Sequence, residues 1–260
     1  PLVATANATA FSCSATNTYQ SAIITIAVPT TGTAPYQYSF NGGATFSASN
    51  TLTVNDNGLD QTFSYVVRDA NGCEANVSNE ITVDPLPDLI INLESSNPTI
   101  NCAGDNNGSI FATAQGGLGN YSYTLQDGLG NTIAATQNSP GYFTELIAGD
   151  YSVMVESGDC IETTAIITIT QPLAPLDASI AVSNITCPGT DNGAVEITAT
   201  GGTGIIKYAI SPQLNQFFET NLFENLAPGD YDIIVQDVLG CYLTFNFTIS
   251  NPEPVILTIV

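Results

Sequence analysis

The sequence contains no histidine and no tryptophan, and its only positively charged side chains are Arg68 and Lys207. Without histidine there is neither a Ser-His-Asp triad nor a histidine general base, which excludes the commonest hydrolytic sites. The net charge of -22 argues against binding to nucleic acid or to an anionic membrane, because both are bound through Lys and Arg. No apolar run of about 18 residues occurs, so we expect no transmembrane helix.

The residues that are abundant favour strands and turns. Thr, Ile and Val are β-branched and pack well in sheets, whereas Asn, Asp, Gly and Pro favour turns. The 43% hydrophobic content is enough to build cores, and the 8% aromatic content points to small ones. The composition therefore predicts an all-β protein of several small domains within 260 residues.

The cysteines indicate an internal repeat. In consecutive pairs they are separated by 60, 58 and 54 positions, and the first members of the pairs recur after 89 and 85 positions. A Gly-Gly pair, an aromatic residue and a Pro-bearing joint keep the same order between them, which predicts tandem repeats. The predicted repeats are residues 1–85, 86–172 and 173–254, and residues 255–260 are predicted to be the first strand of a following repeat.

Each repeat has short strands separated by turn signals, the pattern of an immunoglobulin-like β-sandwich. In the third repeat the predicted strands are 177–183, 193–199, 205–211, 217–224, 230–237 and 242–250. Alternation in the last strand predicts that Leu243, Phe245, Phe247 and Ile249 face the core. Short Pro-rich joints restrict bending, so we expect the sandwiches to be arranged as an extended rod.

The cysteines are predicted to form disulfides. A zinc site would need four Cys or His ligands close together, and a catalytic cysteine would need a basic partner, so the absence of histidine disfavours both alternatives. The repeat predicts one disulfide within each unit, tying two strand ends at one pole of each sandwich. The predicted pairs are Cys13–Cys73, Cys102–Cys160 and Cys187–Cys241, which implies an oxidising, extracellular setting.

Two further features have competing interpretations. Tyr151 and Tyr231 follow a Gly-Asp pair at the start of a late strand, where a tyrosine hydroxyl can bond back to the preceding loop. The alternative is a core tyrosine whose hydroxyl faces water. Calcium is the one plausible cofactor, although the same residue types also make good turns. Its candidate ligands are Asp105, Asn107, Asp191 and Asn192.

The order of these motifs resembles the SprB-type repeat. In the third repeat it is carried by Thr186-Cys187, Asp191-Asn192-Gly193, Gly201-Gly202, Leu226-Ala227-Pro228-Gly229-Asp230-Tyr231, Val235-Gln236-Asp237, Gly240-Cys241 and Thr248-Ile249. The first repeat matches the pattern least. The resemblance implies a very large cell-surface protein of Bacteroidota, in a family that includes gliding-motility adhesins exported by type IX secretion.

From this resemblance we expect a structural and adhesive repeat segment of a secreted cell-surface filament, attached to the outer membrane and without enzymatic activity. The expected partners are a surface polysaccharide or abiotic substratum, further copies of the repeat in the same chain, and the envelope secretion and motility machinery. The alternative is a passive spacer, stalk or accessory region that presents another domain, such as a secreted polysaccharide hydrolase.

Overall fold

The structure is a computed structural model that describes residues 2–75, 79–94 and 97–253. Within these ranges every regular element is a strand, and no helix long and apolar enough to cross a membrane is present. The predicted strand at residues 255–260 lies outside the described residues. Contacts divide the chain into two compact units, one of residues 1–95, 111–142 and 152–166 and the other of residues 96–110, 143–151 and 167–260.

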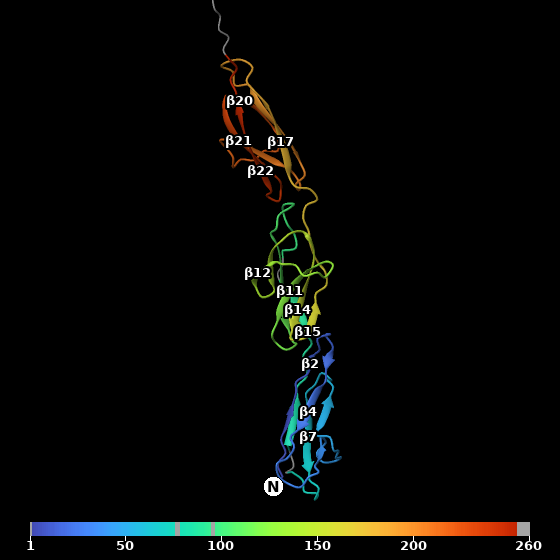
Figure 1. Cartoon of the computed structure of the whole chain (residues 1–260). Helices are drawn as coiled ribbons and strands as arrows, with labels where there is room; N and C mark the ends of the chain where they lie inside the picture. Colours follow the sequence, from blue (N-terminus) through green and yellow to red (C-terminus); the bar gives the residue numbers. More distant parts are fainter. Residues whose placement is uncertain (1, 76–78, 95–96, 254–260) are drawn as a thin grey trace, which may run out of the picture. The chain divides into compact units, whose positions relative to one another are not determined.

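The strands follow one another in short steps along the chain (Figure 1). The first eight are β1 (Ala6–Ala8), β2 (Ser12–Cys13), β3 (Tyr19–Gln20), β4 (Ala22–Ile26), β5 (Gln37–Ser39), β6 (Thr51–Val54), β7 (Gln61–Arg68) and β8 (Asn79–Val83). The next eight are β9 (Ile90–Leu93), β10 (Gly108–Gln115), β11 (Ser122–Asp127), β12 (Thr136–Ser139), β13 (Tyr142–Leu146), β14 (Gly149–Ser157), β15 (Cys160–Thr163) and β16 (Ile167–Ile169). The last six are β17 (Asp177–Ser183), β18 (Gly193–Thr200), β19 (Lys207–Ile210), β20 (Leu222–Leu226), β21 (Gly229–Gln236) and β22 (Tyr242–Ile249).

The same pairing scheme occurs at both ends of the chain. Near the N-terminus the sheets are β1-β4-β6 and β5-β7-β8, and near the C-terminus they are β17-β18-β20 and β19-β21-β22. Between them lie the sheets β12-β13-β10-β9 and β11-β14-β15, with β16 also paired to β14. The pairs for which a register is defined are antiparallel. The fold class is therefore all-β and immunoglobulin-like, as predicted.

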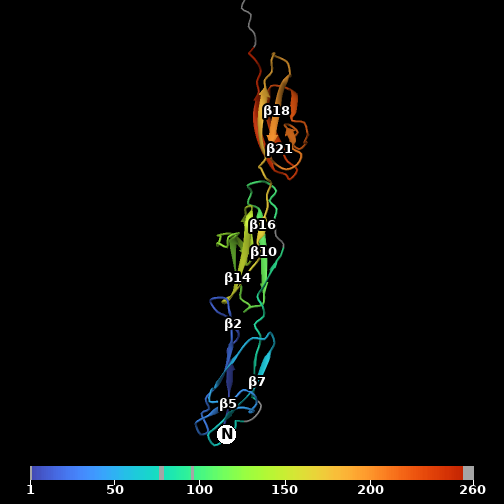
Figure 2. The same ribbon diagram turned by 90° about the vertical axis from the view of Figure 1, so that its right-hand side faces the viewer.

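Alternation places the core between the two sheets of each sandwich. In β4, Ala22, Ile24 and Ile26 are completely buried, whereas Ile23 between them is 43% exposed. Figure 2 shows β18 and β21 facing one another, and their buried Val195, Ile197, Ile233 and Val235 form one cluster. The predicted core face of β22 is confirmed, because Leu243, Phe245 and Phe247 pack against this cluster and Ile249 is buried.

Five of the six strands predicted in the third repeat lie close to their predicted positions, and one is displaced. The strand predicted at 217–224 begins only at Leu222. A turn at residues 213–216, with the Gln216 amide donating to the Gln213 carbonyl, precedes it, and Phe218 makes only an isolated bridge to Tyr208. The chain thus pairs with two different strands on either side of residues 219–221, which prevents one continuous strand.

The two tyrosine hydroxyls bond back to the loop before their strand. The hydroxyl of Tyr151 donates to the Ile147 carbonyl over 2.9 Å, and that of Tyr231 donates to the Ala227 carbonyl over 3.0 Å. Burial raises the pKa of Tyr151, which keeps its hydroxyl a donor. The tyrosine-corner interpretation is therefore confirmed, and the alternative of a water-facing hydroxyl is wrong.

The predicted disulfide pairing is wrong. Cys13 is bonded to Cys160 and Cys102 to Cys241, across 147 and 139 residues, while Cys73 and Cys187 are free and exposed. Each disulfide therefore joins the first cysteine of one predicted repeat to the second cysteine of the next. Oxidation was predicted correctly for Cys13, Cys102, Cys160 and Cys241, although with the wrong partners, and it was predicted wrongly for Cys73 and Cys187.

Strand direction explains the error. Residues at the start of the first sandwich lie beside the Cys73 loop, since a side chain on Gly32 would touch both Leu2 and Asp69. Cys13 instead shares a core cluster with Leu86, where the chain leaves that sandwich. The first strand therefore ends, and the last begins, at opposite poles. A strand of eight residues spans roughly 26 Å, whereas a disulfide brings Cα atoms to about 5–6 Å.

We expect removal of one corner hydroxyl to weaken the third sandwich measurably. Tyr231→Phe keeps the ring, which stacks on Phe247, but deletes the hydrogen bond to Ala227. The loss should be about 1 kcal/mol, seen as a lower urea midpoint. Tyr242→Phe is the matched control, because Tyr242 is 65% exposed. Equal midpoints for the two variants would mean that the corner contributes nothing.

Candidate functional site

The first joint between predicted repeats is closed by a disulfide and a pair of amide hydrogen bonds. The Cα atoms of Cys13 and Cys160 are 5.0 Å apart. Beside them the Asn17 side-chain amide donates to the Ile161 carbonyl over 2.8 Å, and the Ile161 N–H donates back to Asn17 Oδ1 over 2.8 Å. Asn17 has φ +55°, a conformation that Asn tolerates better than most residues. The short β2–β3 hairpin is therefore fixed onto β15.

The peptide segment of this joint is held as well. Asp56 accepts the Leu86 N–H with Oδ2 and the Gly58 N–H with Oδ1, each over 2.8 Å. The Gly117 N–H donates to the Pro87 carbonyl over 2.8 Å, and Leu86 is buried in the core cluster that contains Cys13. Pro-bearing joints leave few backbone donors, and here the Leu86 N–H and the Pro87 carbonyl are both bound.

The Gly-Gly pairs lie directly on the joints. A Cβ atom on Gly116 would lie 1.9 Å from the Asp88 carbonyl oxygen, and one on Gly201 would lie 1.9 Å from that of Pro175. Both glycines also have positive φ, of +79° and +67°. Only glycine therefore lets the turn touch the joint.

The second joint has the same kind of disulfide with different supporting contacts. The Cα atoms of Cys102 and Cys241 are 5.6 Å apart. The Gly104 N–H donates to Gln171 Oε1 over 2.8 Å, and the Gly202 N–H donates to the Ala174 carbonyl over 3.2 Å. Leu173 is fully exposed here, unlike the buried Leu86 of the first joint. The disulfide and the glycine contact are thus common to both joints, whereas a buried leucine is found only at the first.

Buried aspartates shape the loops that present the second-position cysteines. Asp69 accepts the N–H of Cys73 over 2.9 Å and that of Thr33 over 3.1 Å. Asp237 accepts the N–H of Cys241 over 2.9 Å and that of Thr203 over 2.8 Å. The hydrogen bond from the Cys73 amide is the main cause that lowers the pKa of Asp69. The sequence alone did not indicate that these aspartates accept the cysteine N–H.

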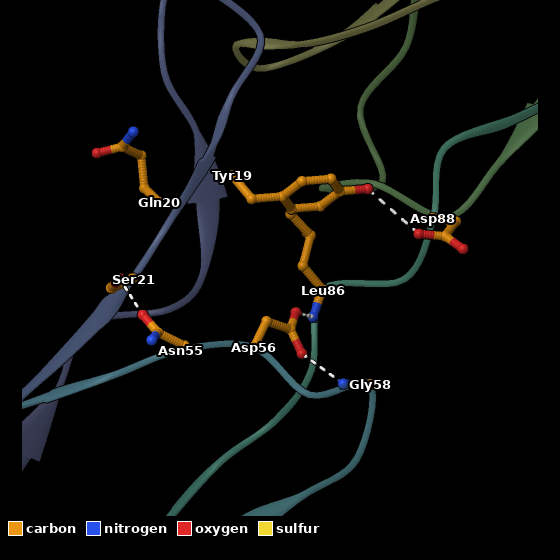
Figure 3. A pocket seen from close by; sticks show the side chains of 8 residues that line it. All are labelled: Tyr19, Gln20, Ser21, Asn55, Asp56, Gly58, Leu86 and Asp88. Atoms are coloured by element: carbon orange, nitrogen blue, oxygen red, sulfur yellow. Dashed lines mark hydrogen bonds between the residues drawn. The ribbon is translucent and has the colours of Figure 1, made fainter.

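A groove of about 360 Å³ opens beside the first joint (Figure 3). Tyr19 is 61% exposed, and its hydroxyl donates to Asp88 over 3.2 Å. Partial burial and the Asp88 carboxylate both raise the Tyr19 pKa. The groove is lined by Tyr19, Gln20, Ser21, Asn55, Asp56, Gly58, Leu86 and Asp88.

The two carboxylates of the groove already accept hydrogen bonds. Both oxygens of Asp56 accept backbone N–H groups, and Asp88 is bound to the Tyr19 hydroxyl. An exposed ring beside amide and carboxylate groups suits a polar ligand with an apolar face. Sequence reasoning missed Tyr19, because a tyrosine six residues after a cysteine has no distinguishing pattern.

The predicted calcium ligands lie in two equivalent loops, Asp105 and Asn107 before β10 and Asp191 and Asn192 before β18. Asn192 is engaged within its loop, where its Oδ1 accepts from the Thr186 N–H and the Thr190 hydroxyl. No group of three or more acidic, cysteine or histidine side chains suited to a metal occurs in the described parts of the chain. The calcium site therefore stays a prediction.

Substitution of one joint glycine should destabilise the protein more than a matched change in the same loop. Gly116→Ala brings a Cβ against the Asp88 carbonyl, whereas Gly119, at φ +84°, has open space around it. Gly119→Ala should cost only the left-handed backbone penalty of about 1–2 kcal/mol. Thermal unfolding of both variants makes the comparison, and equal losses would show that the joint contact carries no free energy.

The Asp69 carboxylate should contribute stability that depends on pH. Its folded-state pKa is lowered, so the contribution is present above the ordinary value of 3.8 and is lost as pH falls through the folded value. Asp69→Asn should therefore lower the melting temperature at neutral pH and lose this effect in strong acid. Asp60→Asn, at an exposed position, is the control. A deficit that is the same at both pH values would contradict the electrostatic explanation.

Comparison with known proteins gives two matches to one family. The family model described as "SprB repeat" matches residues 95–130 and 179–215. No curated protein matches the sequence.

Solved structures resemble the chain at low sequence identity. The N-terminal eight Ig domains of Down Syndrome Cell Adhesion Molecule match with a TM-score of 0.37 and 13% identity, over 90% of this chain and 35% of that one. The Protocadherin GammaB4 extracellular domain gives a TM-score of 0.31 and 12% identity, over 82% and 43%. The Clostridium thermocellum CbhA fibronectin(III)-like modules give 0.32 and 14%, over 65% and 95%. The chain spans about a third of the length of the first of these. The two family matches identify an SprB-type repeat region within the chain described here.

Proposed function

We propose that the chain is a structural and adhesive repeat segment of a secreted cell-surface filament. Residues 1–85, 86–172 and 173–254 are its three repeats, arranged end to end as an extended rod. The observation that carries the proposal is the disulfide that joins each proposed repeat to the next, found twice in a chain with two SprB-repeat matches. A covalent bond across each joint suits a segment that transmits force from a cell to a surface.

The site and the composition support a binding role outside the cell. Disulfides persist in oxidising, extracellular surroundings. The net charge of -22 keeps such a segment soluble and repels copies from one another. Attachment to the outer membrane, export by type IX secretion and a role in gliding motility of a Bacteroidota cell belong to this proposal through the family resemblance, as does contact with the envelope machinery.

The Tyr19 groove is the proposed contact for a surface polysaccharide. Sugar rings have an apolar face and hydroxyl edges, and the groove offers an exposed ring together with Asn55, Asp88 and Gln20. Both oxygens of Asp56 accept backbone N–H groups and Asp88 accepts the Tyr19 hydroxyl, which favours binding without turnover.

A passive spacer is the second candidate, favoured by the closure of the joints. The disulfides, the Asn17 contacts and the glycine contacts hold successive repeats together without any ligand. Such a segment would present another domain, such as a polysaccharide hydrolase, at a distance from the cell.

Adsorption of the purified oxidised chain to polysaccharide-coated surfaces distinguishes these functions. We expect saturable binding, competed by soluble sugar and reduced about fivefold by Tyr19→Ala, the loss of one aromatic contact of about 1 kcal/mol. Tyr242→Ala, with similar exposure of 65%, should bind like the unchanged chain. Binding no stronger than that of an unrelated acidic protein would favour the spacer.

A chelator arm in the same experiment addresses calcium. Loss of binding or of thermal stability on chelation would support a site at Asp105, Asn107, Asp191 or Asn192, and an unchanged curve would remove the calcium prediction.

A further inference from the structure

We propose that Cys73 and Cys187 each form a disulfide with a further repeat of the same kind. Cys73 would bond to a first-position cysteine of a preceding repeat, and Cys187 to a second-position cysteine of a following repeat. The partner is thus a second SprB-type repeat, recognised through a disulfide. This inference rests on the repeat division proposed above but is independent of adhesion.

The register of the two observed disulfides carries the proposal. Cys13 and Cys102 hold the first position of their repeats, and each is bonded to the second-position cysteine of the next repeat. By the same rule, Cys73, a second-position cysteine, would pair with the first-position cysteine of a preceding repeat. Cys187, a first-position cysteine, would pair with the second-position cysteine of a following repeat. One kind of partner, a further repeat, therefore accounts for both free thiols.

Cys73 lies in a loop built like that of its bonded counterpart Cys241. In both loops an aspartate four residues earlier accepts the cysteine N–H over 2.9 Å. The amide of that aspartate donates to the cysteine carbonyl, over 2.9 Å for Asp69 and 3.0 Å for Asp237. The glycine before each cysteine has positive φ, +81° at Gly72 and +90° at Gly240. The Cys73 backbone therefore already has the bonded conformation.

Cys187 likewise matches its bonded counterpart Cys102. The Thr190 N–H donates to the Cys187 carbonyl over 3.2 Å, and the Asp105 N–H donates to the Cys102 carbonyl over 3.1 Å. The glycine two residues after each cysteine has positive φ, +82° at Gly189 and +90° at Gly104. Both turns present the cysteine in the same way, so Cys187 needs no rearrangement to bond.

Exposure separates the free cysteines from the bonded ones. Of the bonded cysteines, Cys13, Cys160 and Cys241 are 6%, 4% and 8% exposed, and Cys102 is half-buried. Cys73 and Cys187 are exposed. A neighbouring repeat would therefore bury two thiols that now face solvent.

Bond formation needs a two-electron oxidant, for which we name a small disulfide such as oxidised glutathione. The Cys187 thiolate attacks one sulfur, forming a mixed disulfide and releasing one glutathione thiolate. The partner cysteine thiolate then attacks the Cys187 sulfur, forming the new disulfide and releasing the second glutathione. The two protons lost by the protein thiols end on the two glutathione thiols.

The test uses two single variants of the full chain, with a second copy supplying the further repeat. Cys73→Ser keeps Cys187, and Cys187→Ser keeps Cys73. One variant is labelled with 15N, the two are mixed in equal amounts in a glutathione redox buffer, and the covalent dimers are separated on non-reducing gels. Peptic digestion and mass spectrometry then identify the linked peptides, since trypsin has only Arg68 and Lys207 to cleave at.

We expect Cys73–Cys187 dimers well above the half share that random pairing would give, and head-to-tail multimers from the unchanged chain. Reducing agent should convert both the dimers and the multimers to monomers. Dimers in the random share, a majority of Cys73–Cys73 or Cys187–Cys187 links, or only glutathione-capped monomers would each overturn the proposal. The Cys13–Cys160 and Cys102–Cys241 peptides in the same digest confirm that the folded pairing is intact.

Discussion

The direction of the chain through each sandwich is the constraint on which the other features depend. The chain enters the first sandwich beside the Cys73 loop and leaves it beside Cys13, so the first and last strands run the same way. The loop after the first strand and the turn before the last strand must then lie at opposite poles. Their cysteines cannot meet within one repeat, and each is available only to a neighbour.

This arrangement gives each joint two covalent connections, the peptide segment and the disulfide. In the chain-entropy model, closing loops of 147 and 139 residues stabilises by about 5 kcal/mol each, on the scale of the whole stability of a small domain. The Cys13–Cys160 bond also couples neighbours, because both cysteines belong to one core cluster. Stability should therefore contain a large nearest-neighbour contribution, more than in repeat arrays without cross-links.

The supporting contacts at the joints are made by small residues rather than by large apolar surfaces. Gly116 and Gly201 let a turn approach the joint carbonyls, and Asp56 binds the N–H of Leu86. Such contacts use little of the surface of a repeat, so the amino acids on the rest of that surface can vary. The Tyr19 groove lies beside one of these joints, so a fixed joint also fixes the shape of the candidate binding surface.

Much of the local structure could be predicted from the sequence. Alternation in residues 242–249 determined which side chains of β22 face the core, and the Gly-Asp-Tyr motif indicated the tyrosine corner as one of two alternatives, which the structure then confirmed. These are short-range consequences of strand geometry and turn chemistry, which a single segment carries by itself. The absence of histidine and the cysteine spacing were likewise enough to indicate disulfides in place of metal or catalytic cysteines.

The partners of the cysteines and the Tyr19 groove were decided only by tertiary structure. Equal spacing within each repeat suggested Cys13–Cys73, but spacing along the chain contains no information about which pole a loop occupies. Tyr19, Asp56 and Asp88 come from three separate segments, and nothing local marks them as neighbours. The sequence by itself determined most strands and turns and indicated that cysteines are oxidised, because these depend on residue types and nearby residues. The folded chain decided which sulfurs meet, because that depends on the direction in which whole strands cross the sandwich.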